Sequence, residues 1–172
     1  RFSNTWARVL GSGWQVSPIL QLKSAQYFTV TSGTDVALTT APGQTANLAN
    51  PAQPYAANQS VAQWLNPAAF TIPAAGTYGN LGYNNLAGPG VFQLNMAVSR
   101  TFPVWGEKRT IQLRAEAFNL PNHLNPAVPG TTPGTVNRNA NNFGQITQDI
   151  SGNNGLSSGD PRIIQLAAKF VF

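Results

Sequence analysis

The sequence predicts an all-β protein built mostly from antiparallel strands. Apolar and polar residues alternate with a period of two in several segments, each close to the roughly 9 to 11 residues with which a tilted strand crosses a bilayer. Helical periodicity is scarce, and 16 Gly and 13 Pro punctuate the chain. The length of 172 residues predicts a single domain covering residues 1–172.

The first two predicted strands cover residues 2–10 and 14–31. Residues 2–10 alternate weakly, because Asn4 and Arg8 interrupt the apolar face. The segment GWQVSPILQLK alternates clearly, and its Pro18 costs one hydrogen bond of a strand ladder. YFTVTSG continues this strand after a short break.

Three further strands are predicted at residues 91–102, 110–119 and 162–172. In VFQLNMAVSRTF every second residue is apolar except Arg100, which makes this the cleanest strand of the chain. TIQLRAEAFN repeats the design, and RIIQLAAKFVF stops on the aromatic Phe172 in mid-pattern. Because a chain end ordinarily frays, an aromatic strand that ends in this way indicates that something holds it.

The connections between these strands are alternately short and long. GSG at residues 11–13 and PVWGEKR after residue 102 are tight turns, whereas residues 32–90 and 120–161 are long and crowded with Pro, Gly and Asn. Loops beyond about 15 residues are uncommon in compact soluble domains. Outer-membrane barrels, however, combine short periplasmic turns with long extracellular loops. We therefore expect strands of outer-membrane barrel type with two long loops, unable to close a barrel alone, since the smallest barrels need about eight strands.

The composition excludes several classes of protein. Charged residues make up 9% of the chain, against about 25% in soluble proteins. The net charge of +5 comes from basic residues scattered singly, apart from Lys108 and Arg109, which argues against nucleic-acid binding. Without Cys there are no disulfides, and without a run of 18 apolar residues there is no transmembrane helix. Since the chain begins at Arg1 without Met or a signal peptide, we expect a processed product or a piece of something larger.

No catalytic, metal or cofactor site is expected, so the protein is predicted not to be an enzyme. His123 is the single His, and nothing in the spacing places a nucleophile or an orienting carboxylate beside it. The five acids are far apart in sequence, and the run from Asp149 to Asp160 lacks the pattern of a calcium loop. Arg114 and Glu116 lie two residues apart on the polar side of one strand. In a barrel they would form a lumenal polar pair, either alone or in contact with a plug or substrate.

Several segments, taken in order, resemble one protein family. They are GWQVSPILQ, YFTVTSGTD, WLNPAAF, GTYGNLGYNNLAGPGVFQLNMAVSRTF, LRAEAFNLPNHLNP, FGQIT and GDPRIIQLAAKFVF. This succession resembles the C-terminal end of TonB-dependent receptor-like proteins, of the acidobacterial type with a carboxypeptidase-regulatory-like N-terminal domain. The resemblance implies a barrel that imports a scarce nutrient across the bacterial outer membrane with energy delivered by TonB. It also implies that the barrel-assembly machinery reads the last strand, at the positions Leu166, Ala168, Phe170 and Phe172.

The sequence lacks the plug, the TonB box and most of the strands of such receptors, which leaves more than one interpretation open. In the first, the chain is part of a longer receptor, and the remaining strands and the plug are its partners. In the second, identical copies pair through open strand edges into an extracellular fibre. A third interpretation is a soluble carbohydrate-binding sandwich, with Trp64, Tyr78 and Tyr83 stacking on sugar rings.

Overall fold

The computed structural model describes residues 11–41, 43–104, 109–130, 135–151 and 161–172. The strand predicted at residues 2–10 lies outside the described residues. The chain divides into two compact units. The first comprises Arg1–Gln21, Phe92–His123 and Pro161–Phe172, and the second comprises Leu22–Val91 and Leu124–Asp160.

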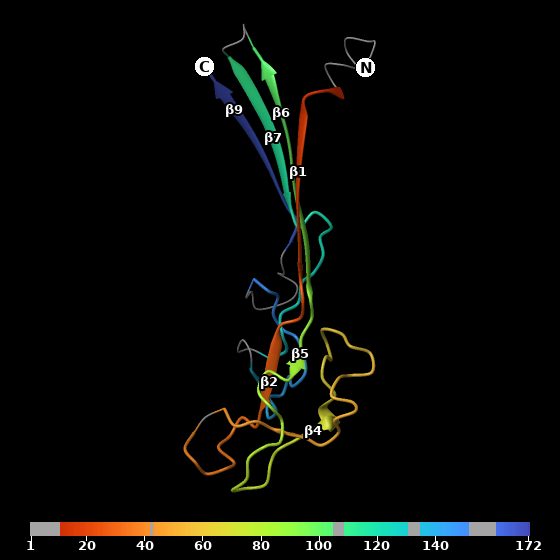
Figure 1. Ribbon diagram of the computed structural model, residues 1–172, viewed down its shortest axis with the longest axis vertical. Coiled ribbons are helices and arrows are strands. Elements are labelled where there is room, and N and C mark those ends of the chain that lie inside the picture. Colours follow the sequence, from red (N-terminus) through yellow and green to blue (C-terminus); the bar gives the residue numbers. More distant parts are fainter. Residues whose placement is uncertain (1–10, 42, 105–108, 131–134, 152–160) are drawn as a thin grey trace. The chain divides into compact units, whose positions relative to one another are not determined.

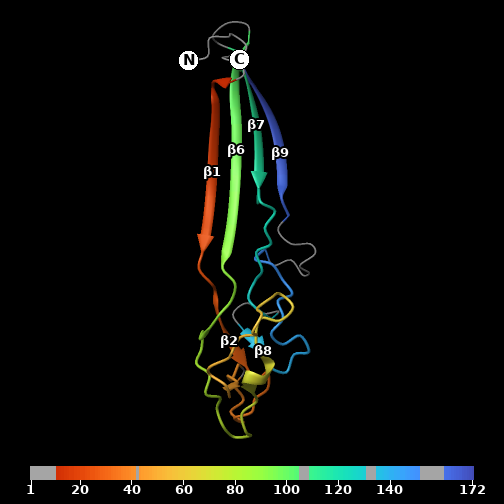
Figure 2. The same ribbon diagram turned by 90° about the vertical axis from the view of Figure 1, so that its right-hand side faces the viewer.

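The first unit is built on a four-stranded sheet with the strand order β1-β6-β7-β9. Figure 2 shows these long strands side by side. β6 pairs with β7, and β7 with β9, in antiparallel orientation. The structure confirms the predicted all-β, mostly antiparallel class, and its described strands do not close into a barrel. The bounds are β1 (Trp14–Lys23), β6 (Val91–Pro103), β7 (Thr110–Phe118) and β9 (Ile163–Val171).

The register of the three paired strands is continuous. β6 pairs with β7 from Met96↔Ala117 to Pro103↔Thr110, and β7 pairs with β9 from Thr110↔Val171 to Phe118↔Ile163. Directly opposed residues of a sheet lie on the same face, and successive residues of a strand lie on opposite faces. Each strand therefore presents its apolar residues on the same side as its neighbour does.

A turn after β7 stabilises one end of the sheet by hydrogen bonds. This is the end at which the two long connections begin. Asn119 and Asn122 have φ of 48° and 54°, the left-handed region that Asn adopts more readily than most residues. The Asn119 side chain accepts from the backbone N–H of His123 (3.0 Å) and donates to its carbonyl (2.9 Å). The backbone N–H of Asn119 donates to Asn95 Oδ1 (2.9 Å), and that of Arg162 donates to Asn122 Oδ1 (3.0 Å). This turn ties together β6, β7 and the start of β9, and His123 belongs to it.

The second unit has short strands and a 3₁₀ turn among its described residues. β2 lies between β5, its antiparallel neighbour, and β8, which runs parallel to it; Figure 1 shows β2 beside β5. β3 and β4 form a separate antiparallel pair. No helix of the described residues is long and apolar enough to cross a membrane. The bounds are β2 (Tyr27–Thr31), β3 (Asn47–Leu48), η1 (Pro67–Ala69), β4 (Phe70–Thr71), β5 (Leu86–Ala87) and β8 (Thr135–Asn137).

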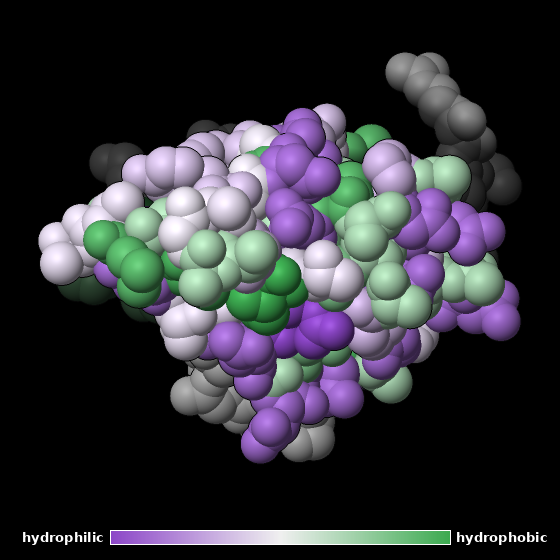
Figure 3. Space-filling model, turned by 90° about the horizontal axis from the view of Figure 1, so that it is seen from below, coloured by the Kyte–Doolittle hydropathy of each residue, from purple (hydrophilic) through white to green (hydrophobic). Residues whose placement is uncertain are grey.

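Both segments predicted as long loops contribute to one hydrophobic core in this unit. Phe70 from residues 32–90 packs edge to face on Phe143 from residues 120–161, with ring centroids 5.6 Å apart. In the view of Figure 3, the molecular surface has small hydrophobic patches between hydrophilic residues. The two long connections therefore fold against each other. The core residues are Phe28, Val30, Ala46, Leu65, Ala69, Phe70, Leu81, Leu86, Val128, Val136 and Phe143.

Polar contacts hold the two long connections together. Arg138 donates from Nε to the carbonyl of Phe70 (2.9 Å) and from Nη2 to that of Pro67 (3.2 Å). Its guanidinium also lies 4.8 Å from the ring centroid of Phe143. Gly144 accepts from the backbone N–H of Trp64 (2.6 Å). Its φ of +77° requires glycine, and a Cβ there would also lie only 3.1 Å from the carbonyl oxygen of Leu65.

The carboxylate of Asp35 organises residues 35–44. It accepts from the backbone N–H groups of Thr39 (3.1 Å) and Thr40 (2.6 Å) and from the side-chain amide of Gln44. Chiefly the hydrogen bond from Thr39 lowers the pKa of Asp35, while desolvation opposes the shift. Thr40, with φ of 62°, is held in the left-handed region.

Replacing Arg138 with Met should loosen the second unit. The variant loses two hydrogen bonds from a charged donor, and we expect the opening free energy of β2 and β8 to fall by about 2 kcal/mol. Hydrogen exchange of the amides in these strands measures that free energy. Lys23→Met, which removes an exposed cation from the same unit, is the control. Equal protection in both variants would contradict the role given to Arg138.

The protection of the Thr39 and Thr40 amides should depend on pH through Asp35. A carboxyl with a lowered folded pKa stabilises the fold above its unfolded pKa, which is near 3.8 for Asp. This stability is lost as the pH falls through the folded pKa. Protection factors of both amides should therefore be high at pH 7 and lower near pH 3, and Asp35→Asn should be low at both. The Ala46 amide, which donates to Val30 (3.0 Å), is the reference within the same unit. Wild-type protection that does not change with pH would disprove the role of the carboxylate.

Candidate functional surface

One face of the first unit's sheet is almost entirely apolar. The register places Val98 beside Ala115 and Ala115 beside Leu166. Leu166 is 81% exposed although it lies in the middle of a strand. A contiguous exposed apolar surface of this kind marks a site that something else covers. On the three registered strands its members are Phe92, Leu94, Met96, Val98, Arg100, Phe102, Ile111, Leu113, Ala115, Ala117, Ile164, Leu166, Ala168 and Phe170.

The opposite face is polar along most of its length, with the exposed Phe118, Ile163 and Val171 at its ends, and it carries the predicted pair. Arg114 Nη2 and Glu116 Oε1 are 2.5 Å apart. Ser99 and Ala167 flank Arg114 across the strands. Because the Arg114 side chain is 50% exposed and that of Glu116 27%, solvent screens the pair, which contributes at most about 1 kcal/mol to stability. The structure thus brings the two residues together, while their place in a lumen stays a prediction.

The four residues of the predicted assembly signal lie along one strand. Leu166, Ala168 and Phe170 share the apolar face, opposite Ala115, Leu113 and Ile111 of β7. Phe172 follows β9, is 93% exposed, and stacks on Phe170 with ring centroids 6.0 Å apart. Their recognition by an assembly machinery stays a prediction.

The apolar face contains one cation, whose setting the sequence analysis missed. Arg100 is only 8% exposed. Its guanidinium carbon lies 5.4 Å from the ring centroid of Trp14 and 4.7 Å from that of Phe102. Both distances are within the range of cation–π attraction. The spacing of Arg100 and Phe102 signals one contact, but the contact with Trp14 depends on the position of β1.

A groove of about 410 Å³ lies beside Arg100 in the first unit. Each Leu of its floor is paired with an Ala: Leu113 with Ala168, and Leu166 with Ala115. The small side chains leave a hollow between the large ones. Arg100 is the direct cross-strand neighbour of Leu113. The lining residues are Trp14, Val98, Leu113, Arg114, Ala115, Leu166, Ala167 and Ala168.

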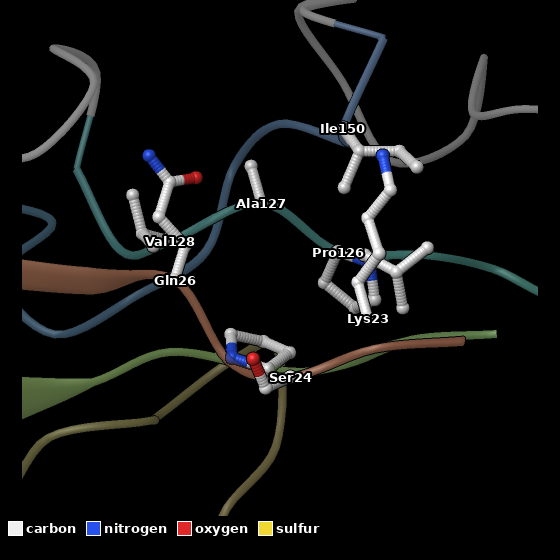
Figure 4. A pocket seen from close by; sticks show the side chains of 9 residues that line it. Lys23, Ser24, Gln26, Pro126, Ala127, Val128 and Ile150 are labelled. Atoms are coloured by element: carbon white, nitrogen blue, oxygen red, sulfur yellow. The ribbon is translucent and has the colours of Figure 1, made fainter. Parts of the chain in front are cut away.

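A second cavity, of about 260 Å³, lies within the second unit. Figure 4 shows the Lys23 side chain reaching toward Ile150. Lys23 is the one ionisable residue among the lining side chains, which mix polar and apolar types. This lining contains no nucleophile paired with a base. Among the described residues there is also no group of three or more His, Cys, Asp or Glu placed to hold a metal ion.

The aromatic residues considered for sugar binding have different environments. Trp64 packs against the hydrophobic core, and its Nε1 donates to the carbonyl of Ala87 (3.0 Å). Tyr78 and Tyr83 are exposed, and the Tyr83 hydroxyl donates to the carbonyl of Gly43 (3.3 Å). Trp64 therefore has a structural role, while the binding of a sugar by the three aromatic residues stays a prediction.

Comparison with known proteins gives the family of the chain. Residues 1–165 match a family model described as an outer membrane beta barrel domain. No curated protein and no solved structure matches. Because the match covers nearly the whole chain, the chain belongs to this family of the bacterial outer membrane. The barrel class predicted from the strand pattern is confirmed.

Proposed function

We propose that this chain, a member of the outer membrane beta barrel domain family, supplies part of the wall of a larger barrel that imports a scarce nutrient with energy delivered by TonB. The observation that supports the wall is that one face of the sheet is apolar and the other is largely polar. The import function and its dependence on TonB rest on the resemblance of segments such as NPAAF and FNLPNH to TonB-dependent receptor-like proteins.

The two faces of the sheet support an assignment of the side that meets lipid. A cation on the lipid side of a barrel costs about 2 to 4 kcal/mol at the bilayer midplane and about 0 to 1 kcal/mol near the interface. Arg114 lies at nearly the same level of the sheet as Arg100, but the polar face also carries Glu116 and polar residues along most of its length, so that face suits a watery lumen. Arg100 lies three residues before the strand end at Pro103, where the cost is small. The apolar face is therefore the outer one.

The sheet also needs neighbours. β1 and β9 are the outermost strands in the order of the described sheet. A backbone group without a hydrogen bond in hydrocarbon costs several kcal/mol. The remaining strands of a barrel would satisfy both edges, and a plug would face the lumen. These partners, together with the barrel-assembly machinery, are part of the proposal.

The ends of the strands give an orientation. Pro103, Thr110 and Val171 lie at one level of the register, so the short turn and Phe172 share one end. The long connections leave from the other end, near Phe118 and Ile163. Short turns are periplasmic and long loops extracellular in this class of barrel. The long connections would thus meet the nutrient first.

A second candidate function follows from the same edges. Identical chains could pair β1 and β9 of neighbouring copies and stack their apolar faces into an extracellular fibre, as edge strands do when nothing blocks them. The exposed length of β9 favours this alternative. The alternative requires no lipid, which distinguishes it from a barrel wall.

Cysteine labelling tests the wall. Because the chain has no Cys, Leu113→Cys and Gln112→Cys each introduce a single reactive thiol into it. A charged maleimide should label position 112 about tenfold faster than position 113 in native outer membranes, since hydrocarbon admits neither thiolate nor charged reagent. After denaturation both should react equally.

Equal labelling in the native sample would contradict the wall. Detergent-independent fibres of an 18.3 kDa chain would establish the alternative. A longer polypeptide that is extracted by detergent, and that is labelled fast at position 112 and slowly at position 113, would support the proposal.

Import and assembly are tested together in the source bacterium. Phe172→Ala should lower both the amount of the native protein in the outer membrane and nutrient uptake, because it removes the terminal aromatic of the proposed signal. Loss of TonB should abolish uptake and leave the amount of protein unchanged. Val171→Ala, on the other face of β9, is the control. Uptake that persists without TonB would overturn the import proposal.

A further inference from the structure

We infer that the cavity of about 260 Å³ in the second unit binds a small organic anion that has one negative charge and a compact apolar body, such as an aromatic carboxylate. The inference deepens the proposed function by naming a chemical class of nutrient, and the ligand's role as a nutrient rests on that function. The binding itself does not require import.

Backbone hydrogen bonds and close packing form the frame of the cavity. The backbone N–H of Gly88 donates to the carbonyl of Gln26 (2.9 Å), and that of Ala127 donates to the carbonyl of Gln148 (2.9 Å). A Cβ on Gly88 would lie only 2.7 Å from Val128 Cγ1, so these two pairs of segments pack closely on each other. Because the frame is already ordered, a ligand does not have to order it, which favours binding.

Three polar side chains of one segment line the cavity and are available to a ligand. Figure 4 shows Lys23 reaching toward Ile150, with Ser24 and Gln26 in the same segment. Among the described residues, no hydrogen bond or ion pair engages the ammonium of Lys23, the hydroxyl of Ser24 or the side-chain amide of Gln26. All three residues are exposed, so a ligand reaches them from solvent.

The other charged side chains described in the second unit are engaged elsewhere. Arg138 donates to two backbone carbonyls, and Asp35 accepts from backbone amides of its own loop. Asp149 is only 1% exposed and does not line the cavity. Since Lys23 is the one ionisable residue of the lining, the lining carries a single positive charge.

This charge and the rest of the lining indicate the class of ligand. One ammonium balances one carboxylate, whereas a dianion such as phosphate would leave a negative charge uncompensated beside apolar walls. An amino acid would bring an ammonium group, for which the lining offers no carboxylate. The volume lies just below the roughly 300 to 1,000 Å³ of sites for drug-sized ligands, so the occupant is smaller than those. The apolar part of the lining consists of Pro89, Val91, Pro126, Ala127, Val128 and Ile150.

The lining residues also lie where a nutrient would arrive. Lys23 is the last residue of β1 and Val91 the first of β6, and the chain between them includes the first long connection. The proposed function places this end of the strands outside the cell.

Titration with two matched ligands tests the site. Binding of benzoate, and of its neutral counterpart benzamide, to the native protein in detergent is followed by saturation-transfer NMR of the ligands. We expect the Kd of benzoate to be about tenfold lower, the size expected for one hydrogen bond from a charged group at a site open to solvent. Inorganic phosphate, which has charge but no apolar body, should not displace benzoate.

Three variants separate charge from shape. Lys23→Gln should abolish the preference for benzoate and leave the Kd of benzamide unchanged, and unchanged hydrogen exchange of the β2 amides shows that the second unit stays folded. Lys169→Gln removes a cation from β9 in the first unit and should keep the preference. Ala127→Leu keeps Lys23 but fills the cavity, and should weaken the binding of both ligands.

The possible results distinguish this site from the proposed function. An equal Kd of benzoate and benzamide in the wild type, or a preference that persists in Lys23→Gln, would overturn the site and leave the wall and the import standing. A preference lost equally in Lys169→Gln, or displacement of benzoate by phosphate, would assign binding to charge alone and overturn the site as well. A preference that Lys23→Gln removes, together with uptake that persists without TonB, would support the site and overturn the import.

Discussion

The unbroken register of β6, β7 and β9 is the constraint on which the rest of the first unit depends. A slip of one residue between two strands would turn every side chain of one strand to the other face. The Arg114–Glu116 pair would then stand among leucines, and Leu166 among polar residues. The separation of an oily face from a watery one is thus a property of the pairing. The turn around Asn119, which fixes where β7 ends relative to Asn95 and Arg162, helps to hold it.

The stability of the second unit depends on how its two long connections are ordered. Ordering long connections costs backbone entropy at every residue, and isolated loops have little apolar surface to offset it. Here the two connections share one core and are joined by Arg138 and by the parallel pairing of β2 with β8. Each connection provides surface that the other buries. Two strand-poor segments thereby form a compact body with a defined surface.

The strand pattern and the two faces of the sheet were predictable because a period of two is a local property. Alternation in residues 91–102 and 110–119 indicated β6 and β7 almost to their ends, and it placed Arg114 and Glu116 side by side. The family match agrees with the barrel class predicted from these strands. The break predicted within residues 14–31 also lies between the end of β1 at Lys23 and the start of β2 at Tyr27.

By itself the sequence determined the fold class, the positions of the described long strands and the polarity of each face, since these depend on neighbours one and two residues apart. Only the tertiary structure decided that Trp64 joins a core, that β2 pairs with β8, and that Arg100 lies between Trp14 and Phe102. These contacts join segments separated by long stretches of chain. Their choice depends on which distant surfaces fit together, and alternation within a strand carries no information about that.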